Sequence, residues 1–176
     1  MKIPVLLGSL LLAGTIVVGG QAPIDAKLGA QLKRLFASAS TFSPKSGAPP
    51  HFKAYANDAQ SGSPRLVGLA FWTTELEPLE RGYDGPIKIL VGLDLNGMLT
   101  GIIVTEHHEP YGYFSVDTAD FSAQFVGKRI SDPFRVGADI DAVSRASISI
   151  SSASRAVRNS ARRIARELLP APESAR

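Results

Sequence analysis

The sequence predicts an α+β fold: a single small domain in which an antiparallel sheet lies between N- and C-terminal helices. Apolar residues recur at helical spacing near both ends, and two apolar runs in the middle flank Asn96-Gly97. An Asn-Gly pair is a strong hairpin signal, because both turn residues take a positive φ at little cost. The length of 176 residues, without an internal repeat, suits one domain plus a targeting segment.

Residues 1–22 have the pattern of a targeting segment. Lys2 precedes an apolar run from Ile3 to Val18, and small residues close the run. A positive residue, an apolar stretch and small residues are typical of a signal peptide, although an uncleaved run of this length can also just span a membrane. We interpret residues 1–22 as a signal peptide or a membrane anchor. The protein is then expected in the periplasm, or anchored to the outer face of the inner membrane.

An amphipathic helix is predicted within residues 23–42. Its apolar residues recur at the spacing of one helix face: Ile24, Leu28, Leu32, Leu35 and Phe36. The Pro- and Gly-rich stretch "SPKSGAPP" then predicts a loop. We place the main domain at residues 43–170 and a tail at residues 171–176.

Four strands and two helices are predicted within the main domain. The strands are "HFKAYA", the aromatic "RLVGLAFWTT" at residues 65–74, and the two arms of the Asn96-Gly97 hairpin. Residues 120–128 predict a short helix or turn, with Asp120 as its N-cap. The last helix has a clear stripe that ends before Pro170: Ala153, Val157, Ala161, Ile164 and Leu168.

Composition excludes several classes of function. The net charge is +3, but five arginines between Arg155 and Arg166 account for much of the basic excess and have no interleaved aromatic residues. This pattern does not favour nucleic-acid binding. The chain has no cysteine, which removes disulfides, iron–sulfur clusters, thiolate zinc sites and cysteine nucleophiles. Redox chemistry would need a bound organic cofactor, or a metal held by histidine and carboxylate ligands.

The stretch "DAVSRASIS", Asp141 to Ser149, precedes the last predicted helix. A serine-rich approach to a helix offers hydroxyls and unpaired backbone N–H groups, which together bind anions such as phosphate. Arg155 and Arg158 would add positive charge. The alternative is that Ser151 or Ser152 simply caps the helix.

Two stretches resemble the FMN-binding domain family: "GYDGPIKILVGLDLNGMLTGIIVTEHHEP" and the later "DAVSRASISISSASRAVRNSARR". This family includes the periplasmic domain of the nitrous-oxide-reduction regulator NosR, and the covalent-FMN subunits of Rnf and sodium-pumping quinone reductase complexes. The order of segments is most similar to the NosR branch. In the family, an Asp-x-x-Ser-Gly-Ala-Thr motif ends in a threonine that a flavin transferase esterifies to the FMN phosphate.

The resemblance assigns the phosphate site to the serine-rich stretch. Asp141, Ser144 and Ala146 match the family motif, and Ser147 stands at the threonine position. A seryl hydroxyl can form the same phosphodiester. Arg145 replaces the motif glycine, which would serve a positive φ or a close backbone approach. An arginine can instead pair bidentately with a non-covalent phosphate, so covalent attachment through Ser147 and non-covalent binding both stay open.

The resemblance also places "TEHHEPYGYF", at the end of the hairpin, near the flavin. The segment that contains His108 and Glu109 precedes a loop beside the cofactor. Tyr111 and Tyr113 would flank the isoalloxazine ring, and Gly112 would allow its close approach.

The family therefore implies an exported FMN-binding electron-transfer protein, rather than an enzyme with its own substrate. Its partners would be membrane or envelope redox proteins, with a flavin transferase if the bond is covalent. One alternative is a non-redox envelope interaction module with a degenerate flavin motif. Another is a metal carrier using His107, His108 and Glu109, although adjacent residues of a strand point to opposite faces.

Overall fold

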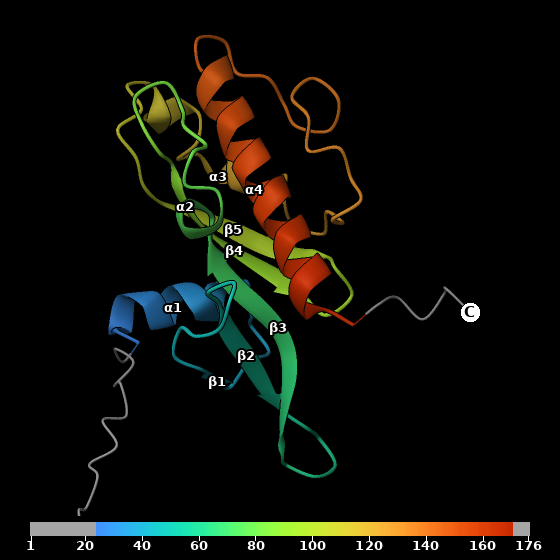
Figure 1. The fold of residues 1–176 in the computed structure, drawn as a ribbon. Coiled ribbons are helices and arrows are strands. Elements are labelled where there is room, and N and C mark those ends of the chain that lie inside the picture. Colours follow the sequence, from blue (N-terminus) through green and yellow to red (C-terminus); the bar gives the residue numbers. More distant parts are fainter. Residues whose placement is uncertain (1–23, 171–176) are drawn as a thin grey trace, which may run out of the picture.

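A computed structural model describes residues 24–170 as one small α+β domain, which confirms the predicted fold class. The predicted targeting segment and the tail lie outside the described residues. The domain contains a five-stranded antiparallel sheet in the order β1-β2-β3-β4-β5, and helices flank it (Figure 1). Between residues 24 and 170, no helix is both long and apolar enough to cross a membrane.

The strands follow one another along the sheet in chain order. They are β1 (Thr41–Phe42), β2 (Phe52–Asn57), β3 (Pro64–Trp72), β4 (Lys88–Asp94) and β5 (Leu99–Glu106). The β4–β5 hairpin turns at Asn96-Gly97 as predicted, with Gly97 at φ +75°. The Asp94 carboxylate accepts hydrogen bonds from the N–H groups of Asn96 and Met98, both at 2.8 Å. β1 was not predicted, because two residues are too short to show a pattern.

Four α-helices and one 3₁₀ turn complete the domain. The helices are α1 (Ala26–Leu35), α2 (Thr73–Leu76), α3 (Ala119–Ala123) and α4 (Ser147–Leu168), and the 3₁₀ turn is η1 (Gly112–Phe114). β3 ends two residues earlier than predicted, because α2 begins at Thr73. The N-cap of α3 is Thr118, whose hydroxyl accepts from Phe121 N–H at 3.1 Å, and Asp120 lies in the first turn.

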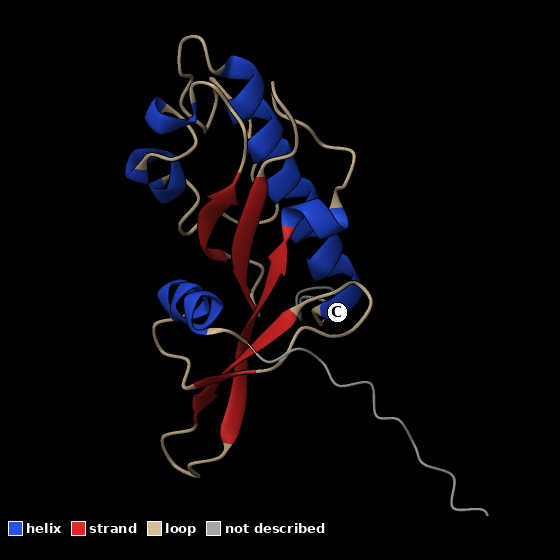
Figure 2. Ribbon diagram, turned by 90° about the vertical axis from the view of Figure 1, so that its left-hand side faces the viewer, coloured by secondary structure: helices blue, strands red, loops and turns tan. Residues whose placement is uncertain are grey.

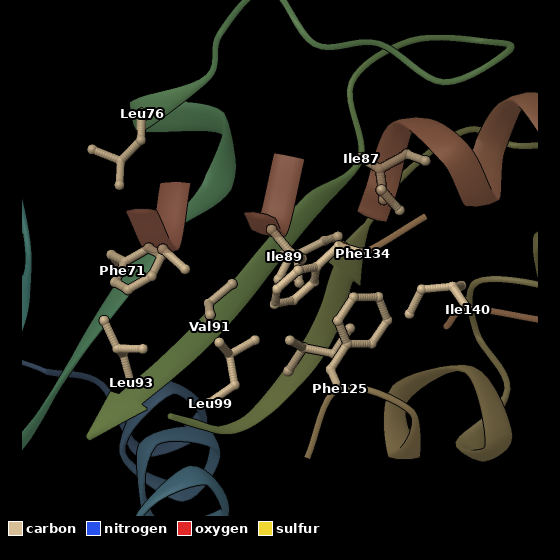
Figure 3. Close-up of a cluster of buried hydrophobic side chains, with 14 of the residues drawn as sticks. Phe71, Leu76, Ile87, Ile89, Val91, Leu93, Leu99, Phe125, Phe134 and Ile140 are labelled. Atoms are coloured by element: carbon tan, nitrogen blue, oxygen red, sulfur yellow. The ribbon is translucent and has the colours of Figure 1, made fainter. Parts of the chain in front are cut away.

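Helices lie on both sides of the sheet (Figure 2). A hydrophobic cluster is buried on each face of the sheet. Successive side chains of β4 point to opposite faces of the sheet. Ile89 and Val91 join the cluster beneath α4, whereas Leu90 joins the cluster beneath α1. The cluster under α4 is the larger, and Figure 3 shows Phe125 and Phe134 packed over its centre. α4 is thus fixed to the sheet along its whole apolar stripe, and its first turn has a fixed position.

Candidate functional site

The first turn of α4 presents free backbone donors. α4 begins at Ser147, and its N-cap Ala146 has no side-chain acceptor. Within residues 24–170, the N–H groups of Ser147, Ile148 and Ser149 have no hydrogen-bond acceptor. Capping by Ser151 or Ser152 was therefore the wrong alternative, because both residues lie inside the helix. Unpaired N–H groups and the helix dipole make this end suited to an anion.

Arg145 precedes this turn in a left-handed backbone conformation, with φ +69°. Such a conformation costs a residue with a side chain about 1–2 kcal/mol. This agrees with the sequence-based inference that a glycine at this position serves a positive φ. Arg145 is exposed, and it lines the same space as the three residues whose N–H groups are free.

That space is a cavity of about 580 Å³. Three segments line it: the loop after α2, the loop after β5, and the start of α4. The lining residues are Tyr83, Pro110, Tyr111, Arg145, Ser147, Ile148 and Ser149. Its apolar and aromatic members are unusually exposed, with Tyr83 70%, Ile148 57% and Tyr111 41% exposed. The cavity combines polar and cationic residues with exposed aromatic and aliphatic side chains.

Glu109 lies behind this cavity and joins two of its walls. The side chain is only 6% exposed. Its carboxylate accepts hydrogen bonds from the N–H groups of Tyr83 and Asp84, both at 3.0 Å, and from the hydroxyl of Ser149. A Cβ on Gly82 would collide with this carboxylate. Glu109 therefore fixes the Tyr83 loop against the first turn of α4.

The histidines do not line the cavity. His107 accepts from Glu109 N–H at Nδ1 (3.0 Å), so its Nε2–H donates to Asp117 at 2.8 Å. His108 is exposed, and the face of Gly112 is occupied by the His107 ring. Across residues 24–170, no three histidine and carboxylate side chains are placed to share a metal ion.

The remaining predicted residues lie around the cavity but outside its lining. Asp141 is exposed, and its N–H donates to Gln124 Oε1 at 2.7 Å. Ser144 is exposed, and Ala146 is buried as the N-cap of α4. Tyr113 is 74% exposed and packs edge-on against Phe114. Of the predicted cofactor residues, Arg145, Ser147 and Tyr111 line one space, and Glu109 supports it.

Sequence reasoning missed Tyr83, Ile148 and Ser149. Tyr83 lies within the "GYDG" stretch, so that stretch was a usable signal, but its side chain joins the site only through the fold. Arg155 and Arg158 were expected to add charge here, yet neither lines this cavity. Arg155 binds Glu80 with an Nη2–Oε1 distance of 2.6 Å.

Another groove, elsewhere on the domain, contains none of the residues predicted to bind the cofactor. It follows β5 between α1 and α3, has a volume of about 440 Å³, and is lined among others by Arg34, Thr100 and Val126. The residues that carry the sequence motifs converge instead on the cavity at the start of α4.

Residues 82–162 match the FMN-binding domain, and this stretch contains every residue that lines the cavity. These residues belong to the FMN-binding domain family. The predicted family is confirmed, and with it FMN as the cofactor.

Three relatives show how far the similarity extends. The G subunit of the ion-translocating oxidoreductase complex of Escherichia coli strain K12 is 45% identical over 53 residues, which are 28% of this chain and 26% of that protein. The corresponding protein of Salmonella typhi is 43% identical over 53 residues, again 28% of this chain and 26% of that protein. That of Photorhabdus laumondii is 34% identical over 102 residues, 52% of this chain and 47% of that protein. The chain thus spans from about a quarter to about half of these relatives.

The residues of the cavity fit FMN. Small-molecule sites usually have volumes of about 300–1,000 Å³, and this cavity lies in that range. Free N–H groups at a helix start and an adjacent guanidinium suit a phosphate. Tyr83, Tyr111 and Ile148 offer exposed surface on which a planar ring system can stack.

Proposed function

We propose that this chain is an exported electron-transfer flavoprotein, which holds FMN by its phosphate at the start of α4. The observation that carries the proposal is that Arg145, Ser147, Ile148 and Ser149 line one cavity, and that the N–H groups of the last three have no acceptor within residues 24–170. These residues supply hydrogen bonds and positive charge to a dianionic phosphate. Arg145, which replaces the family glycine, adds a fork of donors that a glycine lacks.

Ser147 is the residue we assign to covalent attachment. Its side chain is exposed, lines the cavity, and has no hydrogen-bond partner within residues 24–170. A flavin transferase would join Ser147 Oγ to the phosphorus of an activated flavin nucleotide such as FAD. The Oγ–P bond forms, the P–O bond to AMP breaks, and the serine proton leaves with that group. Without the transferase, the same donors hold FMN non-covalently.

When bound, FMN supplies the one- and two-electron chemistry. The chain positions the cofactor: α4 fixes the phosphate end, and Tyr83, Tyr111 and Ile148 support the ring end. These three side chains are exposed, so a partner protein can come close to the ring. This arrangement favours electron relay between proteins over turnover of a bound substrate.

The comparisons support a redox partner in the envelope. The relatives are components of an ion-translocating oxidoreductase complex. We infer that this chain exchanges electrons with membrane or envelope redox proteins, and that residues 1–22 direct it to the periplasm or anchor it to the inner membrane. The likeness to the NosR branch stays a prediction.

Absorption and intact mass test the proposal. The full chain is exported in a host that supplies a flavin transferase together with FAD and FMN, and is then purified. We expect a yellow protein whose colour survives denaturation, and a mass increase equal to FMN less one water. A colourless protein of unshifted mass would contradict the proposal and favour the non-redox interaction module.

The variant Ser147→Ala is expected to lose the covalent flavin completely and keep its fold, because Ser147 is exposed and caps no backbone group. Intact mass reports the attachment, and circular dichroism reports the fold. The matched control is Ser151→Ala, one turn further along α4, which should carry the full mass increase. A mass increase that persists in Ser147→Ala would move the attachment to Ser144 or Ser149.

A further inference from the structure

A second cavity lies further along α4, on the side of the loop that precedes the flavin motif. Its volume is about 270 Å³. The residues that line it are Phe134, Arg135, Val136, Ser151, Arg155 and Arg158. Three arginines, from two segments far apart in sequence, therefore line one small space. The flavin proposal uses none of them.

Most of this positive charge is not neutralised. Arg155 pairs with Glu80, and the hydrogen bond to that carboxylate raises the pKa of Arg155 further. Arg158 bonds neutral oxygens, Asn159 Oδ1 at 3.1 Å and Pro133 O at 3.4 Å. Over residues 24–170, the Arg135 guanidinium has no hydrogen-bond or ion-pair partner. Three cations against one carboxylate leave a net charge of +2 at the cavity.

The loop holds Arg135 in place without neutralising it. Asp139 accepts from Arg135 N–H at 2.7 Å, Phe134 N–H at 3.1 Å and the Lys128 ammonium at 2.9 Å. Burial alone would raise the pKa of Asp139, but these donors outweigh it and lower that pKa. Phe134 anchors the loop in the core at φ +50° and is 1% exposed. Asp139 is thus engaged with the backbone and Lys128, and the Arg135 side chain stays exposed.

The rest of the domain has the opposite charge. Residues 128–170 contain nine Lys and Arg against four Asp and Glu, a net of +5. Residues 24–127 contain eight against eleven, a net of −3. A molecule with this asymmetry attracts a negatively charged partner to the side formed by α4 and its neighbouring loop.

We propose that the arginine cavity is the docking point for an acidic surface on the protein that exchanges electrons with the flavin. This inference rests on the proposed function. Ser147, Ser151 and Arg155 follow one another at i, i+4 and i+8 on α4, about 6 Å apart along the helix axis. A partner that places a carboxylate in the cavity is therefore held beside the flavin site.

The shape of the cavity favours a carboxylate side chain of a protein. Guanidinium forks pair with carboxylates bidentately, and the half-buried Val136 offers apolar contact to the methylene groups of a glutamate. Anionic membranes are recognised by clusters of about four to eight Lys and Arg residues, and only three arginines line this recess. Arg135 is the residue to change, because its side chain supports no other group in the described chain.

The first experiment measures the rate of electron transfer from the flavin-loaded full chain. The reduced protein is mixed rapidly with ferricyanide, an anionic oxidant, or with tris(phenanthroline)cobalt(III), a cationic one, at low ionic strength. In Arg135→Glu we expect oxidation by ferricyanide to slow by about tenfold and oxidation by the cobalt complex to accelerate. Arg65→Glu, at the far end of β3, makes the same charge change and should alter neither rate more than about twofold. Equal effects of the two variants would overturn the proposal.

The second experiment measures the binding of an acidic peptide, and it does not need the flavin. An oligoglutamate peptide is titrated into the protein by calorimetry, with oligoglutamine as the control peptide. We expect oligoglutamate alone to bind. Arg135→Gln and Arg135→Glu should weaken the affinity for oligoglutamate at least tenfold, whereas Arg65→Glu should not.

Sedimentation with vesicles of anionic phospholipid tests a membrane as the other source of negative charge. If vesicles bind and the peptide does not, the proposal that the partner is a protein would be overturned. A colourless protein that still binds the peptide would overturn the flavin proposal and the electron-transfer role of the partner, and would leave only the binding of an acidic surface.

Discussion

Arg145 occupies a backbone conformation that a glycine would adopt without cost. Its φ of +69° places it in the left-handed region, immediately before the free N–H groups of α4. The chain therefore keeps a strained residue at the point where a phosphate would bind. We interpret the strain as the cost of placing a guanidinium beside that phosphate.

Replacing Arg145 with glycine or alanine separates strain from charge. In an ordinary helix or strand, glycine is less stable than alanine by about 0.5–1 kcal/mol. At position 145 we expect the opposite order, with Arg145→Gly more stable than Arg145→Ala by about 1 kcal/mol, because only glycine relieves the strain. Urea denaturation measures the two free energies of unfolding. Both variants should bind FMN more weakly than the native chain, and an alanine variant more stable than the glycine variant would contradict the assignment.

Ser147 and Ser149 show how two identical residues of one turn acquire different roles. Ser147 is exposed and lines the cavity, whereas Ser149 is 4% exposed and donates to the buried Glu109. The first can react with a phosphate group, and the second is a structural link. Helix geometry separates them, because residues two apart on a helix point in different directions.

At the scale of elements, the Glu109 carboxylate joins the loop after α2 to α4. It accepts from two backbone N–H groups of that loop and from the Ser149 hydroxyl of α4. These are charge-assisted hydrogen bonds in a nearly water-free position, so each is stronger than an exposed one. Through them, the position of Tyr83 at the cavity depends on the position of the first turn of α4.

Breaking this connection should weaken both the fold and the site. We expect Glu109→Gln to lower the free energy of unfolding by about 1–3 kcal/mol, because an amide group would then face backbone donors. Ser149→Ala should lower it by about 1 kcal/mol. Both variants should also bind FMN more weakly, since Tyr83 is no longer held. Urea denaturation and flavin fluorescence titration measure these effects.

The control for this connection is Glu106→Gln on β5. Glu106 has a side chain that is 67% exposed and a 3.6 Å contact with Lys88. Its change should alter stability by no more than about 0.5 kcal/mol. If Glu109→Gln were as stable as this control, Glu109 would not be the connecting residue.

At the scale of the whole molecule, the sheet separates two hydrophobic clusters. The cluster beneath α4 supports the proposed flavin site, and the cluster beneath α1 lies on the opposite face. Leu32 of α1 and Ile150 of α4 are both fully buried, one in each cluster. The two residues therefore contribute similar amounts of burial but lie at different distances from the site.

We expect Leu32→Ala and Ile150→Ala each to lower the free energy of unfolding by about 2–5 kcal/mol, the usual cost of a cavity in a core. Only Ile150→Ala should also weaken FMN binding, because Ile150 packs the first turn of α4 onto the sheet. Chemical denaturation and flavin titration, at a temperature where both variants are folded, measure the two effects. A similar loss of FMN affinity in Leu32→Ala would contradict the separation of the two faces.

Much of this fold is visible in local patterns of the chain. The hairpin at Asn96-Gly97 and the stripes of α1 and α4 each depend on residues close in sequence, and turn geometry and helical periodicity decide them. The N-cap of α3, the end of β3 and the start of α4 were missed. Thr118 and Asp120 lie two residues apart, and either could cap α3. The helices α2 and α4 begin without a side-chain cap, so no local residue marks the end of β3 or the start of α4.

Contiguous residues specify the fold class and the family, and they predict a phosphate site within the stretch from Asp141 to Ser149, because the signals for each lie in short segments of the chain. The tertiary structure selects which side chains share the cavity. It brought Tyr83 and Tyr111 to Arg145 and Ser147, turned Glu109 inward as a support, and placed Arg135 beside Arg155 and Arg158. The physical reason is that these neighbours come from segments far apart in the chain, and the packing of α4 and its loops onto the sheet sets their distances.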